Sequence, residues 1–438
     1  MTEPKGQSRR DFLKVSAKGA AGLAAAGTIG APAFVSALGA DKKIGIGQIG
    51  TGVRGFQLLH QVVDAEDAEI RAVCEIYDYH MKRGVEDSKN PKVKQYRDYR
   101  KMLEDPDIDA VIIAVPDHWH ARMVVDACEA GKDVYCEKGL CRTLDEAKAI
   151  VKAVKTNNRV FQLGHQGRSS AANYKAREII DSDMLGKITL IRCNHFRNRK
   201  NPEWRWYSSY SNWEIPKNAT PETIDWNRFL GDAPWQPFNI RRYFHWRCYW
   251  DYGTGVAGDL QSHGMDEINT VMQMGIPQSA MTSGGVYYWK DDRETPDNYN
   301  VIFDYPDRDL AIVYQAEFQS SVFSRNGTQY FGKDASMQIA RGIEVYAEEP
   351  SEKHAKAVEA ARAKGGGYQA PIIYKSTRDD LPKVNGHMAN FLECIRSRQA
   401  PRCNVDVAYE EAVTIIMAIQ SLHEERKVHW NPATEEIV

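Results

Sequence analysis

Short apolar runs alternate with amphipathic stretches along the first part of the chain. The runs are rich in valine and isoleucine, which is typical of strands buried on both faces. The stretches between them place apolar residues at helical spacing. Strands that alternate with helices predict a parallel sheet covered by helices. The predicted strands cover residues 44–49, 69–74, 93–96, 109–115, 132–136 and 159–164.

The pattern changes after residue 168. Apolar and polar residues alternate at 187–194, which predicts a strand with one covered and one open face. Later strand-like runs should join it in a second, mostly antiparallel sheet. These runs lie at 280–289, 298–305, 310–318 and 330–331, and helices are predicted at 171–183, 386–397 and 405–425. The last two helices should close the chain and pack back on the body.

These elements predict an α/β protein with a doubly wound parallel sheet in its first domain and an open, mostly antiparallel sheet in a second α/β domain. We place an N-terminal segment at 1–40, the first domain at 41–168 and the second domain at 169–438. Residues 348–368 are charged and rich in alanine and glycine, and we interpret them as a surface excursion.

A glycine-rich turn follows the first predicted strand. Gly50, Gly52 and Gly55 have the G-x-G-x-x-G spacing that permits a tight turn, close approach of a pyrophosphate and helix–strand packing. The following helix would point its free N–H groups at the phosphates. Glu75 ends the second strand, where an acidic residue binds the adenosine ribose. This carboxylate favours NAD over NADP, although Arg54 is close enough in sequence to reach a phosphate.

The N-terminal segment resembles an export signal. Residues 8–14, Ser-Arg-Arg-Asp-Phe-Leu-Lys, match the twin-arginine export signal. The alanine- and glycine-rich region that follows contains Lys18 and is a poor membrane span. Without a cysteine there, a lipid anchor is not expected. We therefore predict export to the periplasm by the twin-arginine machinery, without a stable membrane anchor.

Charge and cysteine usage narrow the partners. The net charge is −2 and no long basic run is present, which argues against nucleic acid and anionic membranes. The eight cysteines form no C-x-x-C pair, so we expect buried, reduced thiols. Folding in the cytoplasm before export is compatible with that usage.

Residues 198–252 are polar and aromatic with little periodicity. Seven of the ten tryptophans lie there, at positions 204, 206, 213, 226, 235, 246 and 250. Flat aromatic faces beside arginine and asparagine suit a sugar ring, and we expect at least one of them to contact carbohydrate. For each single tryptophan, packing of a long excursion is the alternative.

Three residues can supply chemistry. Lys138 follows the strand at 132–136, and its ammonium would favour an alkoxide as a proton leaves. His263 is a candidate general base because the pKa of histidine is naturally near neutral. Asp259 lies one helical turn earlier and could fix the imidazole tautomer or share the proton. Singly, each has an ordinary alternative: a surface lysine, a buried histidine and a helix N-cap aspartate.

Together these motifs resemble the Gfo/Idh/MocA oxidoreductase family over almost everything after residue 42. The matching pieces are the glycine loop, Glu75, Pro116 with Asp117 and His120, Gly131 to Val134, Glu137-Lys138, and the run of Gly258, Asp259, His263 and Asp266. The resemblance implies hydride transfer between a nicotinamide and a secondary alcohol of a sugar or polyol. It also implies a dinucleotide-binding Rossmann domain at 41–168, and a substrate and oligomerisation domain at 169–438 whose open sheet carries the substrate and the interface of a homo-oligomer. Two positions depart from the family pattern: Gly139 replaces its usual proline, and Asp117 stands where asparagine is frequent.

The motifs and the resemblance give one set of candidate site residues. The catalytic candidates are Lys138, His263 and Asp259; the cofactor-binding candidates are Gly50, Gly52, Val53, Arg54, Gly55, Glu75, Pro116, Asp117, His120, Glu137, Lys138 and Gln166; the substrate-binding candidates are Lys138, Arg168, Trp206, Tyr207, Trp246, Asp259 and His263. No metal is expected, because the spacing of His118, His120, His165, His263 and Asp259 ties no two of them to an ion.

Export constrains the reaction. No pool of free NAD would reoxidise a released cofactor outside the cytoplasm, so the dinucleotide should stay bound and be regenerated in place. Oxidation of one sugar coupled to reduction of another would do this. A redox-neutral glycosidase that passes through a keto-sugar is the alternative, and a sugar- or dinucleotide-binding protein is the non-enzymatic one. The sequence does not name the sugar.

Replacing both arginines of the export motif, Arg9→Lys with Arg10→Lys, should leave the precursor in the cytoplasm. The twin-arginine route requires that pair, and lysine keeps the charge. Cell fractionation followed by immunoblotting measures the distribution. Normal appearance of the mature protein outside the cytoplasm would refute the export prediction.

Overall fold

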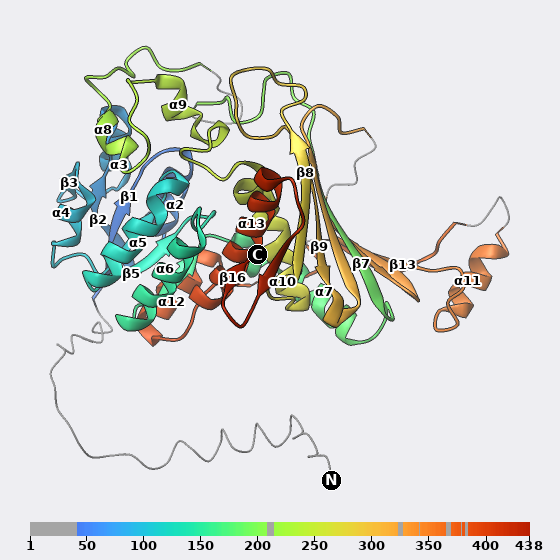
Figure 1. Cartoon of the computed structure of the whole chain (residues 1–438). Helices are drawn as coiled ribbons and strands as arrows, with labels where there is room; N and C mark the ends of the chain where they lie inside the picture. The colour runs from blue at the N-terminus through green and yellow to red at the C-terminus, as the bar shows by residue number, and fades with distance from the viewer. Residues whose placement is uncertain are drawn as a thin grey trace, which may run out of the picture. The chain divides into compact units, whose positions relative to one another are not determined.

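The computed structural model describes residues 42–207, 214–322, 327–340, 342–364, 369–377, 379–381 and 384–438. They all belong to one compact unit, Ala40–Val438, and Figure 1 draws the remaining residues in grey. The predicted export segment and Trp213 lie outside the described residues. Among the described residues, no helix is long and apolar enough to cross a membrane.

The first sheet has six parallel strands in the order β3-β2-β1-β4-β5-β6. Its strands are β1 (Ile44–Ile49), β2 (Ala68–Cys74), β3 (Lys94–Tyr96), β4 (Ala110–Ile113), β5 (Asp133–Cys136) and β6 (Phe161–Leu163). Every residue of β1, β4, β5 and β6 is buried, as their apolar runs predict. The Rossmann-like sheet predicted from the sequence is therefore confirmed.

Helices link these strands. They are α2 (Val53–Val63), α3 (Asp78–Asp87), α4 (Tyr99–Leu103), α5 (His120–Glu129) and α6 (Leu144–Thr156). A capping box begins α6: the Thr143 hydroxyl accepts from the Glu146 N–H, and the Glu146 carboxylate accepts from the Thr143 N–H. Such reciprocal caps satisfy N–H groups that a helix start leaves open.

The second sheet has ten strands in the order β14-β13-β12-β11-β7-β10-β9-β8-β15-β16. Their bounds are β7 (Ile188–Phe196), β8 (Ser279–Gly285), β9 (Asn298–Tyr305), β10 (Leu310–Glu317), β11 (Gly327–Gly332), β12 (Ala335–Ile339), β13 (Gly342–Ala347), β14 (Ile372–Thr377), β15 (Val428–Asn431) and β16 (Glu436–Ile437). Only the β7–β10 pair is parallel among those described. The predicted mostly antiparallel sheet is confirmed.

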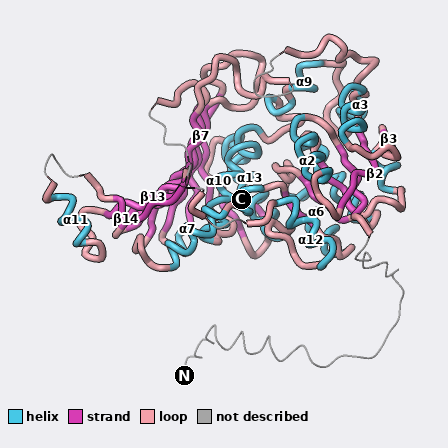
Figure 2. Tube along the Cα trace, turned by 180° about the vertical axis from the view of Figure 1, so that it is seen from behind, coloured by secondary structure: helices cyan, strands magenta, loops and turns pink. Residues whose placement is uncertain are grey.

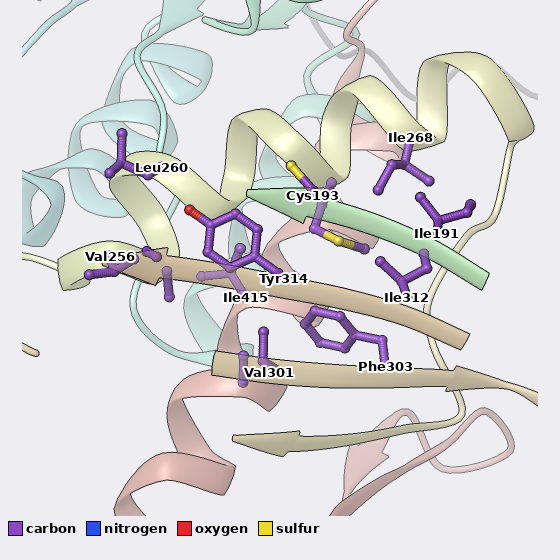
Figure 3. Close-up of a cluster of buried hydrophobic side chains, with 14 of the residues drawn as sticks. Ile191, Cys193, Val256, Leu260, Ile268, Val301, Phe303, Ile312, Tyr314 and Ile415 are labelled. Carbon is purple, nitrogen blue, oxygen red and sulfur yellow. The ribbon is translucent and has the colours of Figure 1, made fainter. Parts of the chain in front are cut away.

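Helices cover one face of this sheet. The covering helices include α7 (Ala171–Asp181), α10 (Ser262–Met272) and α13 (Val405–Glu424), which lie on the same side of the strands (Figure 2). Buried residues alternate with partly exposed ones along β10, as expected when one face is covered. Figure 3 shows Cys193, Ile312 and Phe303 on the face beneath α10. Gly264 lets α10 come close, because a Cβ there would lie 2.5 Å from the Cys193 Sγ.

The C-terminal region differs from the prediction in two ways. Two strands, β15 and β16, follow α13, which was expected to be the last element. Both are too short to show a period-2 pattern, and β15 forms through pairing with β8. The predicted surface excursion also contains α11 (Ala355–Arg362). The helices near the end, α12 (His387–Ser397) and α13, lie where the periodicity placed them, and α13 contacts α6 and β8.

The long aromatic excursion packs on the loops at the carboxyl edge of the first sheet. It carries α8 (Trp226–Leu230) and α9 (Ile240–Phe244). The Phe229 carbonyl accepts from the Trp119 ring nitrogen and lies 2.8 Å from His118 Nε2. Trp204 and Trp226 are buried in the core, whereas Trp235 is 77% exposed. Several of the tryptophans thus serve packing, which was the alternative to sugar contact.

Candidate active site

One cavity of about 510 Å³ combines the glycine loop, the loops after β4 and β5, and the aromatic excursion. It brings together most of the residues that the sequence singled out. Those that line it are Gly50, Gly52, Val53, Arg54, Glu75, Pro116, Glu137, Lys138, Gln166, Trp206, Tyr207, Trp246, Asp259 and His263. Four do not line it: Gly55, Asp117, His120 and Arg168.

The three glycines have different tasks. Gly50 has a φ of +81°, and a Cβ there would lie 2.4 Å from the Ala114 carbonyl oxygen. A Cβ on Gly55 would lie 2.0 Å from the Gly50 carbonyl oxygen, so Gly55 serves close packing of α2 rather than lining the cavity. A Cβ on Gly52 would meet no atom within 4 Å. That open space at the start of α2, beside its free N–H groups, fits a pyrophosphate.

The Glu75 carboxylate is buried and held by backbone donors. It accepts from the N–H groups of Thr51 at 2.8 Å, Ile76 at 2.7 Å and Tyr77 at 3.1 Å. These contacts tie the glycine loop to the end of β2. Arg97 and Arg228 line the same cavity. The sequence reasoning missed both, because they lie far along the chain from the glycine loop.

Arg54 and Glu137 meet across the cavity. The Arg54 Nε lies 2.8 Å from the Glu137 Oε1. The Gln166 amide donates to the Tyr135 hydroxyl at 3.0 Å and lies 3.3 Å from the same Glu137 oxygen. Arg54 therefore already has a carboxylate partner in this structure. Its predicted contact with a phosphate would compete with that ion pair.

The predicted cofactor ligands Asp117 and His120 lie beneath the cavity wall. The Asp117 carboxylate accepts from the Thr254 N–H at 3.0 Å and from its hydroxyl at 2.5 Å. The His120 ring spans the Gly139 carbonyl at 2.7 Å and the Val115 carbonyl at 2.9 Å. His120 thus braces the backbone beside Lys138, and Asp117 holds Thr254; sequence position alone revealed neither contact. Burial raises the pKa of the Asp117 carboxyl.

Lys138 and Asp259 form the polar centre of the cavity. The Lys138 Nζ lies 2.6 Å from the Asp259 Oδ1 and 2.8 Å from its backbone carbonyl oxygen. The same carboxylate accepts from Arg247 Nε at 3.0 Å and Trp204 Nε1 at 2.8 Å. Although burial opposes ionisation, Lys138 and Arg247 lower the pKa of Asp259. The group is a firmly held carboxylate.

The predicted role of Asp259 beside His263 needs correction. The two residues do not lie on one regular α-helix, because Ala257–Gln261 forms a π-helix and α10 begins at Ser262. Among the described residues, the hydrogen bonds of the Asp259 carboxylate go to Lys138, Arg247 and Trp204 rather than to His263. The wider π turn changes which side chains share a face. Asp259 therefore fixes the lysine instead of the imidazole.

His263 lines the cavity beside this ion pair. Burial lowers the pKa of its imidazole well below 6.5, and the positive charge of Lys138 adds to the effect. His195, at the end of β7, also lines the cavity, and its Nδ1 lies 3.1 Å from the Tyr314 hydroxyl. Burial lowers the pKa of His195 to about 4. His195 was not among the residues predicted from the sequence; its only sequence signal is a polar residue at the end of an alternating strand.

Arg168 pairs with Asp266 rather than facing the cavity. Arg197, Glu203 and Arg247 were not selected from the sequence but line the cavity. Arg197 lies 2.8 Å from the Glu203 carboxylate. Glu203 and Arg247 lie in the aperiodic excursion, where sequence patterns say little about neighbours, and Arg197 directly precedes it. The eight cysteines, all buried and free, take no part in the cavity wall apart from Cys74.

Models of two domains match the chain. Residues 44–165 match "Oxidoreductase family, NAD-binding Rossmann fold", and residues 170–278 match "Oxidoreductase family, C-terminal alpha/beta domain". Together with the fold and the cavity, these matches show that the chain belongs to the Gfo/Idh/MocA oxidoreductase family, an NAD-binding family.

The similarity to individual curated proteins covers less than half of this chain. A levoglucosan dehydrogenase from Pseudarthrobacter phenanthrenivorans is 30% identical over 198 residues, which are 43% of this chain and 42% of that protein. A glycosyl hydrolase family 109 protein from a Shewanella strain is 32% identical over 220 residues, 45% of this chain and 47% of that protein. The aligned part thus spans less than half the length of these curated relatives. A solved levoglucosan dehydrogenase, in complex with NADH and levoglucosan, has a similar fold, with a TM-score of 0.63, 18% identity and coverage of 89% of this chain and 99% of that one.

Replacing Gly52 by valine should weaken NAD binding at least ~100-fold while the protein stays folded, because the side chain would fill the space at the pyrophosphate. Isothermal titration with NAD measures affinity, and circular dichroism checks the fold. The matched control is Gly167→Ala, since the nearest atoms to its Cβ lie 3.9 and 4.0 Å away, outside the cavity wall. Unchanged NAD affinity in the Gly52 variant would contradict the assignment of the glycine loop.

Proposed function

We propose that the protein is an exported oxidoreductase that transfers a hydride between a secondary alcohol of a sugar or polyol and a tightly bound NAD. The observation that carries this proposal is one cavity lined by the glycine loop, Lys138 and His263. The glycine loop and Glu75 would hold the dinucleotide. When bound, its nicotinamide supplies the hydride acceptor. The chain supplies the groups that bind the alcohol and move its proton.

Lys138 is placed to bind the reacting oxygen. An ammonium has three N–H donors, and Asp259 occupies two of them through its carboxylate and its carbonyl. The third N–H is available for a hydroxyl in the cavity. As the hydroxyl loses its proton, the ammonium stabilises the developing negative charge. Asp259 keeps the lysine in that orientation.

His263 is the proposed general base. A base must be neutral before it accepts a proton, and the low pKa of His263 keeps it neutral at neutral pH. The acid limb of the pH–rate profile for alcohol oxidation should therefore lie below pH 6.5, the ordinary value for histidine. In the reverse direction, protonated His263 returns the proton to the alkoxide.

The substrate class rests on the relatives and on the cavity wall. The levoglucosan dehydrogenase that this chain resembles is named for a sugar derivative. Trp206, Tyr207 and Trp246 supply aromatic surface, and Arg197 and Glu203 supply hydrogen-bonding groups. Aromatic faces beside paired charges suit a neutral polyhydroxylated ring.

NAD is the proposed dinucleotide, with NADP second. The buried Glu75 carboxylate would repel a 2′-phosphate, which supports NAD. Arg97 and Arg228 are two of the cations that line the same cavity, but each is already paired. Arg97 contacts Asp78 and Arg228 contacts Asp225. To bind a 2′-phosphate, each arginine would have to leave its carboxylate partner.

Export by the twin-arginine route explains why the cofactor should stay bound. Folded export can carry a dinucleotide across the membrane, and the cycle must then close at one site. Oxidation of one sugar and reduction of another closes it. Glycoside cleavage through a keto-sugar also closes it, and the match to a glycosyl hydrolase family 109 protein keeps that as the second candidate.

We also propose a homo-oligomer through the open face of the second sheet, where Met281 and Ile302 are 43% and 46% exposed.

His263→Ala should slow hydride transfer by roughly 10²–10⁴-fold, because the proton acceptor is lost. Lys138→Ala should also slow it, whereas NAD should stay bound in both variants. Stopped-flow absorbance of the reduced nicotinamide measures the step with each sugar of a panel. The control is His60→Ala, a half-exposed histidine on α2 outside the cavity wall. Full activity of the His263 variant would refute its role.

Protein purified from the exported fraction without added cofactor should release NAD(H) on denaturation, approaching one per chain. A sugar that is only oxidised should then reduce the bound NAD once and stop. Turnover should resume with a keto-sugar acceptor, or proceed unaided with a cleavable glycoside. Chromatography of the released nucleotide and of the sugar products measures both. An empty protein that cycles freely with added NAD would overturn the closed cycle but not hydride transfer.

A further inference from the structure

A buried polar cluster lies behind His263. It consists of His165 after β6, Asp266 on α10 and Glu411 on α13, and their donor atoms lie within 4.8 Å of one another. The His165 Nε2 lies 2.6 Å from the Glu411 Oε1, and these side chains are 0% and 2% exposed. Nothing in the proposed mechanism so far uses this cluster.

The charges of the cluster argue against a metal ion. Three such ligands could hold a cation, but Asp266 already pairs with the Arg168 guanidinium. Arg168 balances one of the two carboxylates, and Glu411 and Asp266 raise the pKa of His165, which favours an imidazolium that balances the other. A divalent ion would have to displace the proton and sit beside a guanidinium. The cluster is therefore a charge-balanced ion-pair network.

The network touches the proposed base. The rings of His165 and His263 lie edge to face, with centroids 5.2 Å apart and an interplanar angle of 89°. The other ionisable groups that act on His263 are Lys138, Asp259 and His195. His165 is the contact that leads from His263 away from the cavity, into the core and to α13.

We propose that His165 and Glu411 are positioning residues, which orient the His263 ring and keep it neutral until it accepts the substrate proton. The proposal rests on the proposed function of His263 as base. It makes the C-terminal helix α13 part of the active centre, although Glu411 does not line the cavity.

Electrostatics give the direction of the effect. Although burial opposes protonation, the carboxylates of Glu411 and Asp266 raise the pKa of His165. A charged His165 then disfavours a second positive charge on the adjacent ring, which is one cause of the lowered pKa of His263. Asp259 acts in the opposite sense, but its charge is shared with Lys138 and Arg247. Removing the charge of Glu411 should discharge His165 and so raise the pKa of His263.

Glu411→Gln tests this in the full-length protein. The change keeps the shape of the side chain and removes its charge. The pKa of His263 should rise, because a neutral His165 ring, whose centroid lies 5.2 Å from that of His263, no longer opposes a positive charge there. Carbon-13 and proton NMR of the histidine rings measures this pKa without substrate, with His263→Gln to assign the signal. The acid limb of kcat/KM for sugar oxidation should move to higher pH by the same amount.

Glu410→Gln is the matched control, because Glu410 is the neighbour on α13 and His165 bonds Glu411 instead. It should leave the His263 titration in place. His165→Asn provides a second route if the Glu411 variant folds poorly, and it should also raise the pKa of His263. A metal content of one divalent ion per chain, lost in the Glu411 variant, would overturn the proposal.

The outcomes separate the two hypotheses. A loss of stability in the Glu411 variant with an unchanged His263 titration would show a purely structural role and refute the proposal. If that titration shifts but no sugar is oxidised by the wild type, the coupling stands and the proposed function fails. If His263→Ala abolishes oxidation while neither variant shifts the titration, the function stands and the coupling fails.

Discussion

The ion pair between Lys138 and Asp259 is the contact on which the cavity depends. Lys138 follows a strand of the first sheet, whereas Asp259 belongs to the π-helix that leads into the cover of the second sheet. The two side chains are 12% and 18% exposed, so their attraction is only partly screened. Removing one partner of a pair this buried typically costs ~3–5 kcal/mol, because the other charge is left behind. Arg247 and Trp204 share the carboxylate, which makes the arrangement a small network rather than a single bond.

Local sequence patterns predicted the first sheet well, because the burial of its strands and the turn after β1 are encoded in neighbouring residues. Buried parallel strands are continuous apolar runs, and a glycine at a positive φ, such as Gly50, leaves a readable signature. The second sheet was predictable where its strands alternate, as in β10, and not where they are as short as β16. Pairing with β8 decides β15, and no window of sequence around β15 contains that information.

The candidate site divides in the same way. Gly52, Glu75, Lys138 and His263 were found because each follows a strand or sits in a spaced motif, and all line the cavity. Asp117 and His120, which follow Pro116 in the loop after β4, were also predicted. Their side chains turn toward backbone groups, which spacing cannot show. His195 and Glu411 were missed because their importance lies in neighbours far away in the chain. A π-helix between Asp259 and His263 also changed their predicted relation, and the sequence gives no sign of it.

The last helix and strand have a consequence for synthesis on the ribosome. The glycine loop is translated long before Glu411 and the β15 partner of β8, because both lie far downstream of it in the chain. A nascent chain can therefore shape its dinucleotide pocket long before the core behind His263 is closed. A chain that terminates before α13 would therefore keep its glycine loop but have an open, hydrated interior where Glu411 meets His165.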